Sequence, residues 1–159
     1  MIKFKPYFIA PVLALILLQG CGGGSFATQL RVILAASGPL IESLPLSESI
    51  KSGLITDFTD LGGGAADMAG EIKACADSRP CKLEAVSKFQ SLFETVEARG
   101  HFGSHARLQT VQGIIKGLIA SAKIYFGQRQ TVARGAAPRI VTEDDLKAQI
   151  KELEAAIRP

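Results

Sequence analysis

One stripe of apolar residues constrains the fold of this chain more than any other feature of its sequence. Between Ile50 and Cys75, apolar residues recur at steps of three and four, the spacing of one face of an α-helix. The stripe keeps its phase through Gly62–Gly64, although three interior glycines cost a helix about 3 kcal/mol relative to alanines. We therefore expect one bent helix, with two helices meeting at a glycine hinge as the alternative. The stripe consists of Ile50, Leu54, Ile55, Phe58, Leu61, Ala65, Met68, Ile72 and Cys75.

Helical spacing extends over most of the chain, and no run of alternating β-branched residues predicts a strand. A first helix is expected over 27–44, with a kink or break at Pro39, because proline removes a backbone donor. Ser47 is a good N-cap for the second helix. A third helix is expected near Pro80, which suits a first helical turn, and a fourth from Ser104. Short connections between the second, third and fourth helices predict an all-α, up-and-down bundle of about four helices.

The end of the chain differs in composition from the predicted bundle. Residues 128–141 contain three arginines and no acidic residue, and Gly135 and Pro138 interrupt the segment, which is typical of a flexible basic linker. Thr142 then caps a C-terminal amphipathic helix over 142–159 with an apolar stripe of coiled-coil spacing. Since an isolated helix this short is marginally stable in water, we expect it to be the least firmly docked element and a partner contact. The predicted contact residues are Arg129, Arg134, Arg139, Leu146, Ile150, Leu153 and Ile157.

Residues 1–20 have the parts of a secretory signal. Lys3 and Lys5 precede an almost wholly apolar run from Tyr7 to Leu18. This run of about a dozen residues is shorter than the roughly 20 residues of a membrane-spanning helix, and its flanks follow the secretory pattern. Removing residues 1–20 takes away both lysines and lowers the net charge from +3 to +1. Such a charge gives no indication of nucleic-acid binding, which needs a clustered basic face.

The leader ends in Leu18-Gln19-Gly20-Cys21, which resembles the lipobox of bacterial lipoproteins. In that class a lipoprotein signal peptidase cuts before a cysteine whose sulfur already carries diacylglycerol. The resemblance implies that Cys21 is lipidated, becomes the first residue of the mature chain and holds it to a membrane. The alternatives are an ordinary signal peptide, which would leave Cys21 as a free thiol, and an uncleaved anchor.

Residues 21–26 follow as the lipidated cysteine and a glycine-rich tether, whose GGGS composition is that of a flexible linker. In the lipoprotein class an aspartate directly after the lipidated cysteine usually retains the protein in the inner membrane. Gly22 at that position implies an outer-membrane protein facing the periplasm in a Gram-negative host. In a host with one membrane the protein would face outward.

Cys75 and Cys81 remain as an even pair once Cys21 is lipidated. Export places them in an oxidising compartment, where such pairs become disulfides. Their C-x5-C spacing differs from the C-x-x-C of thiol oxidoreductases, so a structural disulfide between the second and third helices is expected rather than a redox pair.

Two histidines, His101 and His105, are spaced four residues apart, which suits a shared metal only if both lie on one helix. A zinc site needs at least a third ligand, and the nearby sequence offers none. We therefore predict no metal site, and expect capping or solvent contacts at the start of a helix.

Four acidic residues align along the second predicted helix. Paired carboxylates can perform acid–base chemistry when their surroundings separate their pKa values, but nothing in the sequence places these four in a cleft. We expect a solvated helix face. The residues are Asp57, Asp60, Asp67 and Glu71.

Two glycine groups are expected to permit close helix packing within the bundle. Gly62–Gly64 lacks the Lys-Ser/Thr pair of a phosphate-binding loop, and it lies inside the apolar stripe. Gly113 and Gly117 have the GxxxG spacing of associating membrane helices, but Lys116 interrupts the apolar run.

No catalytic constellation, cofactor site or metal site stands out, and we expect a protein that is not an enzyme. The expected function is a membrane-anchored docking or structural module that contacts an envelope protein or a cell-wall component. The alternative is a periplasmic protein that binds a small molecule or lipid in an apolar groove of the bundle, and an enzyme is the third hypothesis. The expected segments are 1–20 signal, 21–26 tether, 27–127 bundle, 128–141 linker and 142–159 C-terminal helix.

Overall fold

The computed structural model describes residues 26–127 and 140–159, and every regular element within them is helical. The all-α prediction is confirmed, but these residues form six α-helices instead of about four and a C-terminal one. The α-helices are α2 (Phe26–Ala35), α3 (Gly38–Ser43), α4 (Glu48–Ala74), α5 (Arg79–Glu97), α6 (Ala106–Gly127) and α7 (Glu143–Ile157), and the 3₁₀-helix η1 covers His101–Ser104.

The extra helix arises from a break in the first predicted helix. α2 ends at Ala35, and α3 begins at Gly38 with Pro39 in its first turn, where the missing proline N–H leaves no hydrogen bond unmade. Leu44 has an extended backbone, so the chain leaves the helix there. The predicted N-cap of the next helix is confirmed, because the Ser47 side chain accepts a hydrogen bond from the Ile50 backbone N at 3.5 Å.

α4 is continuous through its three adjacent glycines, so a single helix forms in preference to two joined by a hinge. Close packing explains one of these glycines: a Cβ on Gly64 would lie 2.2 Å from Leu92 Cδ2 of α5. A Cβ on Gly62 or Gly63 would meet nothing within 4 Å, so the predicted close approach holds for Gly64 alone.

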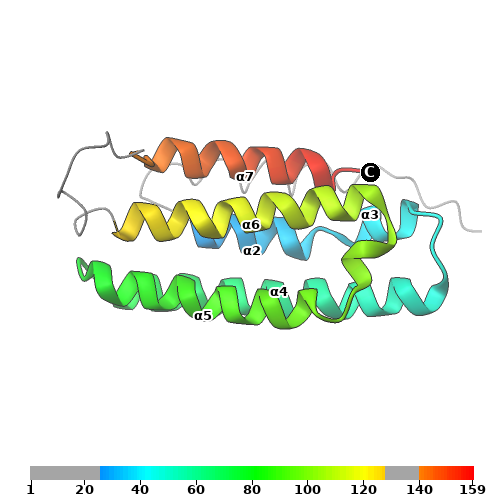
Figure 1. Cartoon of the computed structure of the whole chain (residues 1–159), viewed down its shortest axis with the longest axis horizontal. Helices are drawn as coiled ribbons and strands as arrows, with labels where there is room; N and C mark the ends of the chain where they lie inside the picture. The colour runs from blue at the N-terminus through cyan, green and yellow to red at the C-terminus, as the bar shows by residue number, and fades with distance from the viewer. Residues whose placement is uncertain (1–25, 128–139) are drawn as a thin grey trace, which may run out of the picture.

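Five of these helices form a ring around one core. α2 packs on α4, α4 on α5, α5 on α6, α6 on α7, and α7 returns to α2. Figure 1 shows α7 along one side, α6 and α2 in the middle, and α4 and α5 along the other side. Aromatic rings fill the core beside η1, where Phe102 lies 5.4 Å from Phe58 and 6.5 Å from Phe93 between ring centroids. None of the described helices combines the length and apolar character needed to cross a bilayer.

α7 is part of this ring, which differs from the expected loosely docked helix. Its stripe covers the core of its own chain: Leu146 is 1% exposed, Ile150 4%, Leu153 0% and Ile157 4%. Val141, which lies in the predicted linker, is also buried in the core. The last helix and residues 26–127 therefore share one hydrophobic core.

Candidate functional site

Asp57 is the only charged side chain buried among the described residues, and it organises the most extensive polar cluster of the bundle. Its Oδ1 accepts a hydrogen bond from Arg99 Nη1 at 2.9 Å, and its Oδ2 lies 2.8 Å from His101 Nδ1. Burying a carboxylate is costly unless it is paired and hydrogen-bonded, and both oxygens of Asp57 have such partners.

Arg99 joins this cluster to the surface of α4. Its Nη1 also donates to Asp60 Oδ2 at 2.7 Å, so one guanidinium nitrogen bridges two carboxylates one helical turn apart. Hydrogen bonds to Asp60 and Asp57 raise the pKa of the Arg99 guanidinium above its ordinary value. The left-handed Gly100 (φ 81°) turns the chain between Arg99 and His101, so both side chains reach α4.

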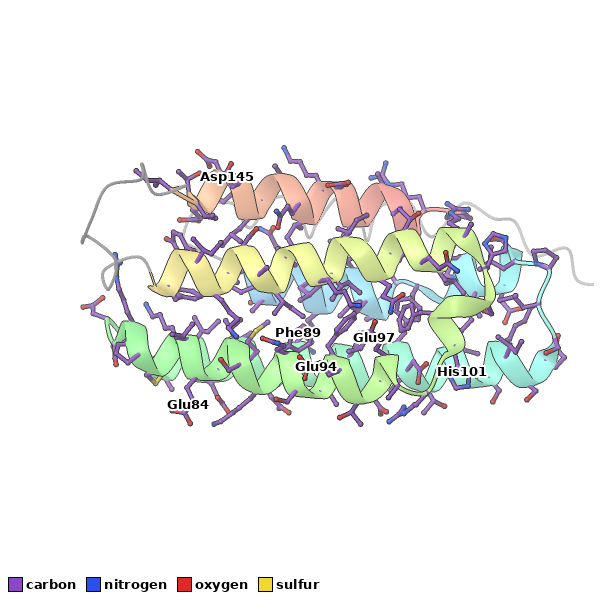
Figure 2. The ribbon with its side chains drawn as sticks, viewed as in Figure 1. Glu84, Phe89, Glu94, Glu97, His101 and Asp145 are labelled. Atoms are coloured by element: carbon purple, nitrogen blue, oxygen red, sulfur yellow. A yellow bond between two sulfur atoms is a disulfide. The ribbon has the colours of Figure 1, made fainter. Side chains whose placement is uncertain are left out.

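The His101 ring occupies space that α4 leaves open at a glycine. A Cβ on Gly53 would lie 2.6 Å from both Cε1 and Nε2 of His101. We call Gly53, Asp57, Asp60, Arg99 and His101 the Asp57 cluster. It fastens the connection between α5 and α6 to the first half of α4, and Figure 2 shows His101 at this junction.

This arrangement corrects the prediction for the acidic residues of α4. Asp67 is exposed, as a solvated face requires, but Asp57 is fully buried. A signal for this burial was present in the sequence, because Asp57 stands three residues after Leu54 and four before Leu61, in phase with the apolar stripe. Both oxygens of the Asp57 carboxylate are therefore engaged by partners within the protein.

The two histidines have separate roles. His105 Nδ1 accepts a hydrogen bond from the Arg107 backbone N at 3.1 Å, so it caps the start of α6, whereas His101 belongs to the Asp57 cluster. Within residues 26–127 and 140–159, no group of three or more His, Cys, Asp and Glu side chains is arranged to hold a metal ion.

A second polar group lies along the contact between α5 and α6. Glu97 Oε1 accepts a hydrogen bond from Gln112 Nε2 at 2.6 Å and pairs with Lys116. Further along, Lys123 Nζ donates to Gln90 Oε1 at 2.8 Å. Because these residues join neighbouring helices, they fix the antiparallel register of α5 and α6. Figure 2 labels Glu97 on α5.

The hairpin between α4 and α5 carries the predicted cysteine pair. Cys75 and Cys81 lie within disulfide distance, with their Cα atoms 5.6 Å apart and their sulfurs bonded. Cys75 is the C-cap of α4 and Cys81 stands in the first turn of α5, so the link closes the turn between the helices. Within that turn Ala76 has a left-handed backbone, with φ 47°.

A shallow hollow of about 270 Å³ lies between α6 and α7. A Cβ on Gly113 or Gly117 would meet nothing within 4 Å, so the predicted close approach of these glycines within the bundle is wrong. Gln149 Nε2 donates to Ser121 Oγ at 2.9 Å, while its buried Oε1 has no hydrogen-bond partner among the described residues. The hollow is lined by Thr110, Gly113, Ile114, Gly117, Gln149 and Glu152.

The predicted site residues are therefore distributed over different parts of the molecule. Cys75 and Cys81 are brought together, and the four apolar residues of α7 lie in the core. Cys21, Arg129, Arg134 and Arg139 lie outside the described residues.

Comparison with known proteins adds no relative: no protein-family model, curated protein or solved structure matches the chain.

Proposed function

We propose that this chain is a lipid-anchored protein of the bacterial cell envelope whose helical bundle serves as a non-enzymatic docking or structural module. The observation that carries the proposal is Leu18-Gln19-Gly20-Cys21 behind a charged and then apolar leader. The start of the bundle is compatible with this anchor, because α2 begins at Phe26 and only four residues lie between it and Cys21.

The interior of the bundle supports a structural role. The carboxylate of Asp57 is occupied by Arg99 and His101, and aromatic and aliphatic side chains fill the core. The hollow between α6 and α7 measures about 270 Å³, and a second one between α4 and α5 measures about 180 Å³, whereas small-molecule sites span about 300–1,000 Å³. These dimensions favour the docking or structural module over a protein that encloses a small molecule or lipid.

The proposed partners are an envelope protein or a cell-wall component, in addition to the membrane that holds the Cys21 lipid. Because the stripe of α7 is buried, such a partner would contact the exposed outer surface of the ring. Gly22 favours an outer-membrane position facing the periplasm in a Gram-negative host, and an outward position in a host with one membrane.

The proposal is tested by intact mass and fractionation of the full chain expressed in a bacterium. The wild-type protein should lose residues 1–20, carry the added diacylglyceryl mass and sediment with membranes. The Cys21→Ser variant should lack that mass and appear in the soluble fraction. The proposal would be overturned if the wild-type protein lacked the lipid mass and were as soluble as the Cys21→Ser variant.

A further inference from the structure

The chain enters the bundle at a defined end. Phe26 and Ala27, the first residues of α2, are 8% and 0% exposed, and the Phe26 ring lies 6.2 Å from that of Phe126 in the last turn of α6. Four residues separate Phe26 from Cys21, so their Cα atoms can be at most about 17 Å apart. A lipid on Cys21 would therefore hold this end of the bundle close to a bilayer.

Three other parts of the structure meet at the same end. α7 runs antiparallel to α6, since Gln149 bonds to Ser121 and Arg107 to the carbonyl of Arg158, so the start of α7 lies beside the end of α6. The hairpin between α4 and α5 also lies on this side in Figure 1. In Figure 2, Glu84 and Asp145 lie toward this end and His101 toward the other. We call it the anchor end: the start of α2, residues 74–79, 124–127 and 140–144.

The anchor end exposes apolar side chains. Four large hydrophobic residues are exposed in the described part of the chain, and two of them, Ile124 at 43% and Ile140 at 69%, belong to the anchor end. Side chains of this kind are stabilised when they enter the boundary between lipid headgroups and acyl chains.

The hairpin between α4 and α5 carries the basic side chains at the anchor end, whereas the start of α7 is acidic. Residues 73–82 carry three basic side chains, Lys73, Arg79 and Lys82, and one acid, Asp77. The acids at the start of α7 have partners in the protein: Asp145 completes a capping box, and Lys147 pairs with Glu143 and Asp144. Basic residues near a membrane surface are attracted to anionic lipid.

We propose that the anchor end lies against the bilayer that holds the Cys21 lipid, with the His101 end pointing away from it. The inference rests on the proposed lipidation of Cys21. The short covalent connection brings the anchor end to the bilayer, and Ile124, Ile140 and the basic hairpin contact it. Since α4 alone, with 27 residues, is about 40 Å long, the two ends lie at clearly different heights above the membrane.

Two matched positions report these heights. Asp144 at the anchor end and Glu48 at the start of α4 both have side chains that are 93% exposed, and both stand in the first turn of a helix. D144C and E48C are each labelled with a fluorophore, without reductant, in the full lipidated chain. The proteins are then reconstituted in phosphatidylethanolamine–phosphatidylglycerol vesicles containing a headgroup-linked quencher. We expect several-fold stronger quenching at position 144 than at position 48.

A second comparison tests the contact itself. The double variant I124S/I140S should weaken quenching at position 144, while the matched double variant V32S/I55S, which changes the other two exposed large hydrophobics, should not. The orientation is tested in a protein that carries the lipid mass and floats with vesicles. In that protein, equal quenching at positions 144 and 48 would overturn the orientation. An unchanged signal at position 144 in I124S/I140S would also overturn it. Absence of the lipid mass would instead overturn the proposed function, and the orientation with it.

Discussion

The imidazole of His101 lies so close to Gly53 that α4 has no room for a Cβ at that position. The ring is held there through Nδ1, which lies 2.8 Å from a carboxylate oxygen of the buried Asp57. A helix position that lacks a side chain and a charged residue one turn later therefore act together. They hold the η1 segment against α4.

Gly53→Ala should displace the His101 ring and leave Asp57 with one partner fewer. We expect the free energy of unfolding of Gly53→Ala to be about 1–3 kcal/mol lower than that of Gly63→Ala. This is the cost of leaving a buried polar group without its hydrogen-bond partner. The control removes a glycine from the same helix, where a Cβ would meet nothing within 4 Å, and should stabilise by up to about 1 kcal/mol. Urea unfolding of both variants measures the difference, and equal stabilities would contradict the packing argument.

The two carboxylates that bind Arg99 should differ in their contribution to stability. Asp57 is fully buried, so Asp57→Asn should destabilise by about 1–3 kcal/mol through loss of its charge-assisted hydrogen bonds. The Asp60 side chain is 37% exposed, and Asp60→Asn should cost less than about 1 kcal/mol. Thermal and urea unfolding compare the variants; an equal loss would show that burial does not set the ranking.

The docking of α7 is tested by truncating a single side chain. Leu153 is fully buried, and Leu153→Ala should lower the free energy of unfolding by about 2–5 kcal/mol through lost burial and the cavity left behind. Lys151→Ala on the exposed face of the same helix should change it by less than about 0.5 kcal/mol. A neutral Leu153→Ala would mean that α7 is detached from the bundle in solution.

Ala76 should be improved by replacement with glycine. It has φ 47° in the turn after α4, a left-handed conformation that is costly for residues with a Cβ and is usually taken by glycine after a helix. Ala76→Gly should stabilise by about 0.5–1 kcal/mol, whereas Ala74→Gly, at the last helical residue two positions earlier, should destabilise by up to about 1 kcal/mol. Opposite shifts in melting temperature would establish the backbone origin of the effect.

The parts of the fold that follow from local chemistry could be predicted from the sequence. The stripe from Ile50 to Cys75 predicted the continuous α4, because the phase of apolar residues records which face is buried. Ser47 and Thr142 were assigned as N-caps from residue type and position, and both accept the expected backbone hydrogen bonds. Such signals lie within a few residues of the structure that they determine.

The interactions that the sequence does not indicate join distant segments. Asp57 binds Arg99 and His101, which lie 42 and 44 residues further along, and the loop between α5 and α6 gave no indication that it returns to α4. The apolar stripe of α7 could be predicted from the sequence, but the helices that it packs against could not. An apolar stripe shows that a surface must be covered, and it does not show whether that surface belongs to the same chain.

The position of α7 between α6 and α2 has a consequence for how the chain is made. Synthesis proceeds from the N-terminus, so α2 is produced first and α7 last, yet the two are neighbours in the finished ring. The flank of α2 that α7 covers therefore stays bare until the final residues have been synthesised and, in an exported chain, have crossed the membrane. Until then, this flank of α2 must be kept from associating with other unfolded chains. An mRNA truncated before the codon for Leu146 would yield a protein in which the same flank stays exposed.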